Sequence, residues 1–200
     1  MSPPVKPGQR IGLLGGSFNP AHEGHLHISS LALRRLNLDQ LWWLVSPQNP
    51  LKPESGMASL PDRVKVARKV ASEDSRIVVT DIENELSSNY TVDTINALKL
   101  RFSGVSFVWV MGADLLVQLP RWSRWRALFR TVPIAVFARP AYSSRALSSK
   151  VARRFAASRV ARFRASALAD MRPPAWAFLR TRLSRESATR LRAESRSRKQ

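Results

Sequence analysis

The fold of this chain is decided by the stretch Gly12-Leu-Leu-Gly-Gly-Ser-Phe-Asn-Pro-Ala-His-Glu-Gly-His25. Its apolar start, Ile11–Leu14, has the length and character of a buried strand, and Gly24–Leu36 carries apolar residues at helical spacing. A glycine-rich turn between a strand and a helix is a typical phosphate-binding arrangement. Glycines let a phosphate approach the backbone, and the helix N-terminus offers N–H groups and a partial positive charge.

All three histidines of the chain, His22, His25 and His27, lie in or directly after this turn. The spacing of His22 and His25 can place both side chains on one side of the first helical turn. Glycines alone would indicate only a tight strand-to-helix turn. The stretch is neither the G-x-G-x-x-G dinucleotide fingerprint nor H-E-x-x-H, and the chain has no cysteine or further histidine to complete a zinc site. We therefore predict no metal site built from protein side chains.

The composition fits one globular domain, because the chain has 200 residues and 44% of them are hydrophobic. The absence of cysteine excludes disulfide and thiol chemistry. Residues 1–8 lack the apolar core of a signal peptide, and Val132–Ala138, among the longest apolar runs, is too short to span a bilayer. We expect a cytoplasmic protein that does not contact a membrane, and an oligomer is compatible with the sequence.

Positive charge is concentrated near the C-terminus. The net charge of the whole chain is +19, and residues 141–200 hold fourteen Arg and two Lys against three acidic residues, a net charge of +13. One interpretation is a polyanionic partner, either nucleotide phosphates or nucleic acid. The other is a solvated, arginine-rich surface, which we favour because aromatic residues interleaved with the basic ones are sparse there. We therefore do not expect nucleic acid to be a partner.

Strands and helices alternate along the chain, which predicts an α/β fold: a Rossmann-like, doubly wound parallel sheet with a small helical C-terminal part. We expect a disordered lead over residues 1–9, one domain over 10–193 and a basic tail over 194–200. Further strands are predicted at Leu41–Val45, Arg76–Thr80, Val105–Met111, Val132–Ala138 and Trp176–Leu179. Further helices are predicted from Ser59 to about Ala71, from Thr91, before Arg130, at Leu147–Arg164 as a basic helix and at Ser184–Glu194. A polar loop is predicted at Asp81–Asn89.

The combination Gly-Gly-Ser-Phe-Asn-Pro-x-His-x-Gly-His over Gly15–His25 resembles the signature of the nucleotidyltransferase superfamily. The H-x-G-H element is similar to that of class I aminoacyl-tRNA synthetases. Several later segments resemble one branch, the bacterial nicotinate mononucleotide adenylyltransferases. These segments are Asn49–Lys52, Glu85–Thr94, Met111–Asp114, Leu119–Trp125 and Ala138–Pro140. The order and number of these motifs make the resemblance more specific than the histidine turn alone.

The resemblance spans roughly residues 10–192 and departs from the family near its end. The family carries Ile-Ser-Ser-Thr-x-Ile-Arg, and the best match here is Glu186-Ser-Ala-Thr-Arg-Leu-Arg192. Thr189 and Arg192 align, whereas Glu186 replaces an apolar residue and Ala188 replaces a serine. An alternative register begins at Leu183. Ala141 also stands where the family usually has glycine.

The resemblance implies a Mg²⁺-dependent adenylyltransferase of NAD biosynthesis that joins ATP and nicotinate mononucleotide, giving nicotinate adenine dinucleotide (deamido-NAD) and pyrophosphate. The attacking phosphate oxygen is already ionised, so no general base is required, and Mg²⁺ would arrive with ATP. The implied catalytic residues are His22, His25 and Lys52. The implied ATP-binding residues are Gly15, Gly16, Ser17, Phe18, His22, His25, Asp114, Thr189 and Arg192. The implied substrate-binding residues are Asn19, Lys52, Tyr90, Thr91, Trp122 and Arg139.

Three alternatives remain open at this point. The first is a relative that adenylates or cytidylates another phosphate substrate, such as phosphopantetheine; Tyr90-Thr91 and Trp122–Trp125 argue against it. The second is a nucleic-acid-binding protein that uses the positive charge, although no RRM signature or zinc-finger spacing supports it. The third is a non-catalytic Rossmann-like scaffold; the intact His22, His25, Lys52 and Asp114 argue against it.

Overall fold

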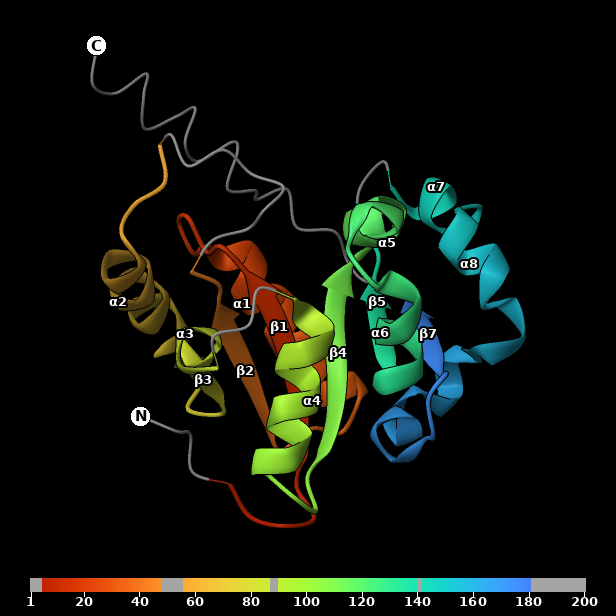
Figure 1. The fold of residues 1–200 in the computed structure, drawn as a ribbon, viewed down its shortest axis with the longest axis horizontal. Helices are drawn as coiled ribbons and strands as arrows, with labels where there is room; N and C mark the ends of the chain where they lie inside the picture. Colours follow the sequence, from red (N-terminus) through yellow and green to blue (C-terminus); the bar gives the residue numbers. More distant parts are fainter. Residues whose placement is uncertain (1–4, 48–55, 87–89, 140–141, 181–200) are drawn as a thin grey trace.

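A seven-stranded parallel sheet forms the centre of the molecule (Figure 1). The computed structural model describes residues 5–47, 56–86, 90–139 and 142–180. The strand order is β3-β2-β1-β4-β5-β7-β6, and every neighbouring pair is parallel. The strands are β1 (Arg10–Gly16), β2 (Gln40–Val45), β3 (Ile77–Thr80), β4 (Ser106–Gly112), β5 (Ile134–Phe137), β6 (Arg159–Val160) and β7 (Trp176–Leu179). The predicted doubly wound α/β fold is confirmed.

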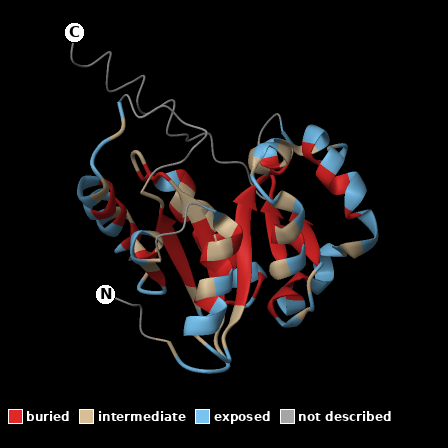
Figure 2. Ribbon diagram, viewed as in Figure 1, coloured by how far each residue is buried: buried red, intermediate tan, exposed pale blue. Residues whose placement is uncertain are grey.

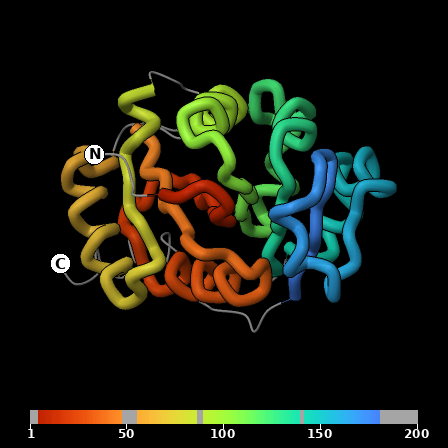
Figure 3. The backbone as a smooth tube through the Cα atoms, turned by 90° about the horizontal axis from the view of Figure 1, so that it is seen from below, coloured from red at the N-terminus to blue at the C-terminus, as the bar shows by residue number. Residues whose placement is uncertain are grey.

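Helices cover both faces of this sheet, as the view from below in Figure 3 shows. The α-helices are α1 (Glu23–Arg35), α2 (Leu60–Ala71), α3 (Ile82–Glu85), α4 (Thr91–Arg101), α5 (Ala113–Gln118), α6 (Trp125–Thr131), α7 (Ser143–Leu147) and α8 (Lys150–Arg154). The 3₁₀ helices are η1 (Leu119–Arg121), η2 (Ala156–Ser158) and η3 (Arg162–Asp170). Among these described elements, no helix is long and apolar enough to cross a bilayer.

The core has two layers because the central strands bury both of their faces (Figure 2). Alternate residues of a strand point to opposite faces of a sheet. Leu13 and Trp42 accordingly join the layer under α4 to α6, whereas Leu14 and Trp43 join the layer under α1 and α2. Such doubly buried strands read as continuous apolar runs, which is why the sequence of β2 predicted its burial.

Local sequence signals account for the helix starts that were predicted. Ser59 caps α2: its Oγ accepts a hydrogen bond from the Asp62 backbone N–H at 3.3 Å and donates to Asp62 Oδ2 at 2.6 Å. Pro61 occupies the first turn, where its missing N–H costs nothing. In α4, the predicted apolar stripe of Val92, Ile95 and Leu98 is buried.

The prediction of a polar loop over Asp81–Asn89 was wrong in its first half, where α3 forms. Ile82 is 1% exposed, and its backbone N–H donates to Thr80 Oγ1 at 3.2 Å. Helix α5, which follows Gly112 directly, was also not predicted. Both helices are short, so their sequences contain less than two turns of apolar periodicity.

The prediction of one basic helix over Leu147–Arg164 was wrong as well. The chain instead forms α8, η2, the edge strand β6 and the start of η3. Phe155 is the reason: its ring stacks on Phe129 at 4.3 Å, and its carbonyl accepts a hydrogen bond from Trp176 Nε1 at 2.8 Å. These contacts turn the chain toward β7, so the C-terminal part contributes two strands to the sheet in addition to its helices.

The described part of the expected lead, residues 5–9, contacts the domain. Val5 packs against the core layer under α4, and the Gly8 N–H donates to the Gly104 carbonyl at 2.8 Å. The predicted helix at Ser184–Glu194 and the tail at 194–200 lie outside the described residues.

Gly15 is expected to be required for packing as well as for the turn. A Cβ at Gly15 would lie 2.5 Å from Cη2 of Trp109, a rigid ring that is 2% exposed. Gly15→Ala should therefore lower the free energy of unfolding by about 1–3 kcal/mol, the usual cost of overpacking a core. Gly16→Ala is the matched control, because its nearest neighbour would be Phe18 Cε2 at 3.4 Å. Equal losses in urea titrations of the two variants would contradict this explanation.

Candidate active site

The predicted site residues gather where the strand order reverses. β1 pairs with β2 on one side and with β4 on the other, so the chain departs from β1 in two directions. In open α/β sheets, ligands bind outside the carboxyl ends of the strands at this switch point. Gly15 and Gly16 end β1, Asp114 follows β4 and Arg139 follows β5.

His22 and His25 cap helix α1 together. Nδ1 of His22 accepts a hydrogen bond from the Gly24 N–H at 3.0 Å, and the His22 N–H donates to Nδ1 of His25 at 3.2 Å. This is a capping box in which imidazoles replace the usual hydroxyl and carboxylate. A neutral imidazole whose Nδ1 accepts a hydrogen bond carries its proton on Nε2, and we assign this tautomer to both rings from their contacts. The two rings lie 4.0 Å apart, so two N–H donors of defined position stand at the start of α1.

Aromatic neighbours fix the orientation of His25. Its ring lies 4.7 Å from that of Phe18 and 5.9 Å from that of Trp43, and Phe18 stacks on Trp43 at 5.0 Å. Ser29 Oγ donates to the His25 carbonyl at 2.7 Å and accepts from Trp43 Nε1 at 2.7 Å. His25 is therefore preorganised, which is what stabilisation of developing charge requires.

Asn19 holds the turn against the segment that precedes α2. Its Nδ2 donates to the Gly56 carbonyl at 3.2 Å, and its Oδ1 accepts from the Ala58 N–H at 3.3 Å. The Asn-Pro step of the motif thus fixes the turn to a segment that lies some forty residues later.

Asp114 and Arg139 form an ion pair across the ends of β4 and β5, with Arg139 NH1 3.2 Å from Asp114 Oδ2. Gly112 makes this approach feasible, because a Cβ there would lie 2.5 Å from Asp114 Oδ1 and 2.8 Å from Arg139 Nε. Asp114 Oδ1 is buried and accepts no hydrogen bond within the described residues. A buried oxygen of this kind is costly unless a donor reaches it, so it fits a ligand hydroxyl.

The residues predicted at the pyridine ring come from two neighbouring elements. Tyr90 precedes α4 and is half-exposed, and no described side chain caps this helix. Trp122 follows η1 and is half-buried against the core. Arg124 NH1 donates to Asp93 Oδ1 at 2.6 Å, which joins the Trp122 segment to the first turn of α4. The structure thus brings these predicted residues into one region.

Other predicted residues lie outside the described part of the chain. They are Lys52, Thr189 and Arg192. Within the described ranges, no group of three or more His, Cys, Asp or Glu side chains is arranged to hold a metal ion.

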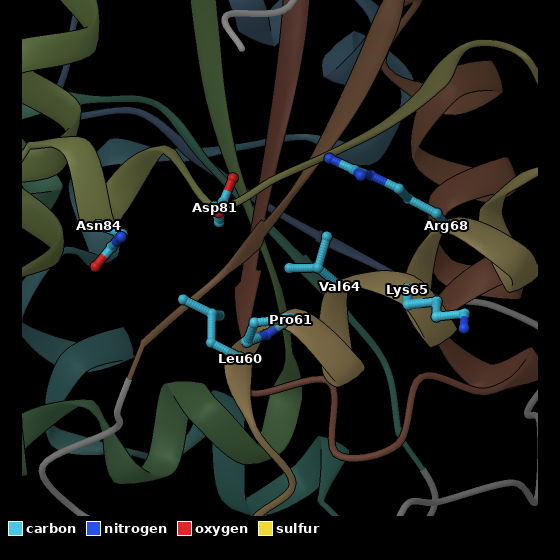
Figure 4. A pocket seen from close by; sticks show the side chains of 7 residues that line it. All are labelled: Leu60, Pro61, Val64, Lys65, Arg68, Asp81 and Asn84. Carbon is cyan, nitrogen blue, oxygen red and sulfur yellow. The ribbon is translucent and has the colours of Figure 1, made fainter.

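A hollow of about 410 Å³ lies along helix α2 (Figure 4). Helix α2 forms one wall, and Asp81 and Asn84 form the other. Its lining residues are Leu60, Pro61, Val64, Lys65, Arg68, Asp81 and Asn84. None of the predicted site residues is among them, so the hollow is not the candidate active site.

Sequence reasoning missed two ionisable residues that are shielded from solvent to different extents. Arg63 of α2 is buried, with 3% of its surface exposed, and Glu83 of α3 is partly buried. The available signal for Arg63 was its helical spacing, because it stands four residues before the buried Ala67. No comparable signal marks Glu83, which lies in the stretch predicted to be a loop.

Glu83 is expected to make the stability of the protein depend on pH. Burial raises the pKa of its carboxyl from 4.5 to about 7, partly offset by a hydrogen bond from Thr94 Oγ1 at 3.3 Å. The folded state thus binds this proton more tightly than the unfolded state does. The contribution of Glu83 protonation to the free energy of unfolding is fully present below pH 4.5 and is lost as the pH rises toward about 7.

Glu83→Gln should therefore be more stable than the wild type by about 3 kcal/mol at about pH 8, and about equal to it near pH 4. Urea titrations at the two pH values measure this difference. Glu85→Gln is the control on the same helix: Glu85 is exposed, and the hydrogen bond from Arg101 lowers the pKa of its carboxyl. The explanation fails if Glu83→Gln gives no gain at the higher pH, or if Glu85→Gln gives the same gain.

Comparison with known proteins identifies relatives of this chain. Residues 13–193 match the family model described as cytidylyltransferase-like. The chain is 57% identical over 148 residues to a protein of Parvibaculum lavamentivorans, named a probable nicotinate-nucleotide adenylyltransferase, with 74% of this chain and 73% of that protein covered. A protein of Cereibacter sphaeroides with the same name is 53% identical over 150 residues, covering 75% and 80%.

Solved structures share the fold. The Plasmodium falciparum nicotinic acid mononucleotide adenylyltransferase in complex with NaAD has a TM-score of 0.68 at 16% identity, covering 92% of this chain and 83% of that one. The same enzyme in complex with APC has a TM-score of 0.68 at 15% identity, with the same coverage. At this level of identity, the likeness concerns the fold alone.

Proposed function

Since the chain belongs to the cytidylyltransferase-like family, and within it to the nicotinate-nucleotide adenylyltransferases, we propose that it joins ATP and nicotinate mononucleotide to give deamido-NAD and pyrophosphate. The observation that carries this proposal is the pair of histidines capping α1, at the end of the sheet where the buried Asp114 Oδ1 is unsatisfied among described residues. The reaction would be a step of NAD biosynthesis in the cytoplasm.

The proposed reaction is a direct in-line transfer. A phosphate oxygen of nicotinate mononucleotide attacks the α-phosphorus of ATP, and the bond from that phosphorus to the bridging oxygen breaks. Pyrophosphate leaves with the electron pair of that bond, so no proton has to be removed from the nucleophile. The protein therefore has to align two anions and to stabilise the charge that grows on the phosphates.

The turn and the start of α1 would hold the phosphates. The backbone of Gly15–Phe18 allows close approach, and Nε2–H of His22 and of His25 donates to phosphate oxygens. Lys52, Thr189 and Arg192 are proposed to add further contacts from segments outside the described residues. Mg²⁺ would arrive coordinated by the triphosphate and would neutralise part of its charge.

The two nucleosides would lie on either side of the phosphates. Asp114 Oδ1 would accept a hydrogen bond from a ribose hydroxyl of ATP. Arg139 would hold the Asp114 carboxylate in place through their ion pair and would itself face the mononucleotide substrate. Trp122 would stack on the pyridine ring, and the Tyr90–Thr91 start of α4 would contact its carboxylate. Asn19 would serve the mononucleotide by fixing the turn.

Pyrophosphate release tests the proposal. The full-length protein is incubated with ATP and Mg²⁺ and with nicotinate mononucleotide, with phosphopantetheine or with no acceptor. We expect pyrophosphate release only in the sample that contains nicotinate mononucleotide together with ATP and Mg²⁺. A larger kcat/KM with phosphopantetheine would instead assign the protein to a related transferase reaction.

A further inference from the structure

Arg63 of α2 forms a buried junction between three segments of the candidate site. Its guanidinium donates from Nε to the Ala58 carbonyl at 3.0 Å, and from NH1 to the carbonyls of Ser17 at 2.7 Å and Ser46 at 2.8 Å. NH2 donates to the Pro47 carbonyl at 2.8 Å. Arg63 thus connects the turn after β1, the end of β2 and the approach to α2.

The charge of Arg63 is held by peptide carbonyls in all four of these contacts. Burial lowers the pKa of the guanidinium, but arginine stays charged throughout the physiological range. Removing a cation from water costs several kcal/mol. The burial of Arg63 is therefore weak evidence that its role is to stabilise the fold alone. A planar group with five N–H donors is, in contrast, well suited to fixing several carbonyls at once.

The contact with Ser17 determines the backbone orientation of Gly15–Phe18, which we call the phosphate turn. A trans peptide is planar, with its N–H opposite its carbonyl, so directing the Ser17 carbonyl at Arg63 turns the Phe18 N–H away from it. Phe18 has a φ of +44°, which few non-glycine residues adopt and which persists only where the surroundings impose it. The Ser46 N–H adds a hydrogen bond to the Gly16 carbonyl at 3.0 Å.

We propose that Arg63 is a positioning residue for adenylyl transfer, because it sets the backbone of the phosphate turn against the end of β2. This role rests on the proposed function. Arg63 lies behind the phosphate turn and acts on the phosphates through the peptide between Ser17 and Phe18. Its loss should therefore impair alignment of the reacting phosphates more than it impairs ground-state binding of ATP.

Arg63→Lys tests this role, because it keeps the charge but a single ammonium cannot reach three segments. We expect kcat to fall at least about tenfold, as misplaced reactants do, with the Kd of a non-hydrolysable ATP analogue changed less than about threefold. Rates are compared below the unfolding transition of each variant. The matched control is Arg68→Lys, an exposed arginine of the same helix, which should behave as the wild type does.

A folded Arg63→Lys protein with the wild-type kcat would overturn the proposal. A fall in kcat that is fully accounted for by the fraction of Arg63→Lys protein that is unfolded would also overturn it. If Arg63→Lys does not fold, Arg63→Ala is assayed at low temperature with added ethylguanidinium. Saturable recovery of kcat supports the role, and no recovery of kcat, with or without recovery of Tm, overturns it. Failure of the proposed function is distinct, because the wild type itself would then form no dinucleotide.

Discussion

Replacing His25 by alanine is expected to lower kcat by about 10²–10³-fold, the effect of removing one preorganised electrostatic donor. Nδ1 of His25 accepts from the His22 N–H, so Nε2–H is the donor that the ring offers to a phosphate. The rings of Phe18 and Trp43 hold it in that orientation. Loss of the cap should also cost about 1 kcal/mol of stability, as removal of a helix cap usually does.

His25→Gln separates these two effects. Glutamine is the alternative residue at this position of a capping box, so it can accept from the His22 N–H and preserve the helix start. We expect His25→Gln to keep the wild-type Tm and to lose kcat nearly as fully as His25→Ala does. His27→Ala is the control on the same helix, since His27 lies outside the capping box. Wild-type turnover in a folded His25→Ala protein would refute the assignment of this residue.

The second large effect concerns the choice between acid and amide substrates. We expect kcat/KM to be about 10- to 150-fold higher for nicotinate mononucleotide than for nicotinamide mononucleotide, because the amide loses one charge-assisted hydrogen bond worth about 1.5–3 kcal/mol. The start of α4 offers backbone N–H donors and positive dipole character to a carboxylate. No described side chain caps this helix.

The structure adds a reason for this preference. Asp93, in the first turn of α4, would repel a carboxylate, but Arg124 pairs with it at 2.6 Å. Arg124→Gln should therefore reduce the preference by raising KM for the acid more than for the amide. Equal kcat/KM values for the two substrates of the wild-type protein, or a preference for the amide, would refute the helix-terminus explanation while leaving adenylyl transfer in place.

Much of the fold could be predicted because its signals are local. The apolar run Trp176–Leu179 predicted β7 with its observed bounds, and Ser59 with Pro61 predicted the start of α2. The segment after Leu147 could not be predicted, because its path depends on Phe155 packing against residues of other elements. Basic residues at helical spacing favour a helix locally, and these distant contacts override that preference.

The candidate site could likewise be predicted only in part. The sequence placed His22 and His25 at the first turn of a helix and Asp114 at a strand end, but only the structure shows that both histidines accept hydrogen bonds at Nδ1 and that Asp114 pairs with Arg139. Arg63 was missed because its contact with Ser17 joins residues 46 positions apart. A side chain whose partners are all backbone carbonyls has no partner residue type to look for in a sequence.

Adenylyl transfer is tested most directly by identifying both products formed by the wild-type protein from ATP, Mg²⁺ and nicotinate mononucleotide. Mass spectrometry and a pyrophosphate assay on the same samples give their stoichiometry. We expect deamido-NAD and pyrophosphate in equal amounts, with ATP preferred to CTP. Pyrophosphate without the dinucleotide, or a cytidylyl product formed in preference when CTP competes with ATP, would contradict it.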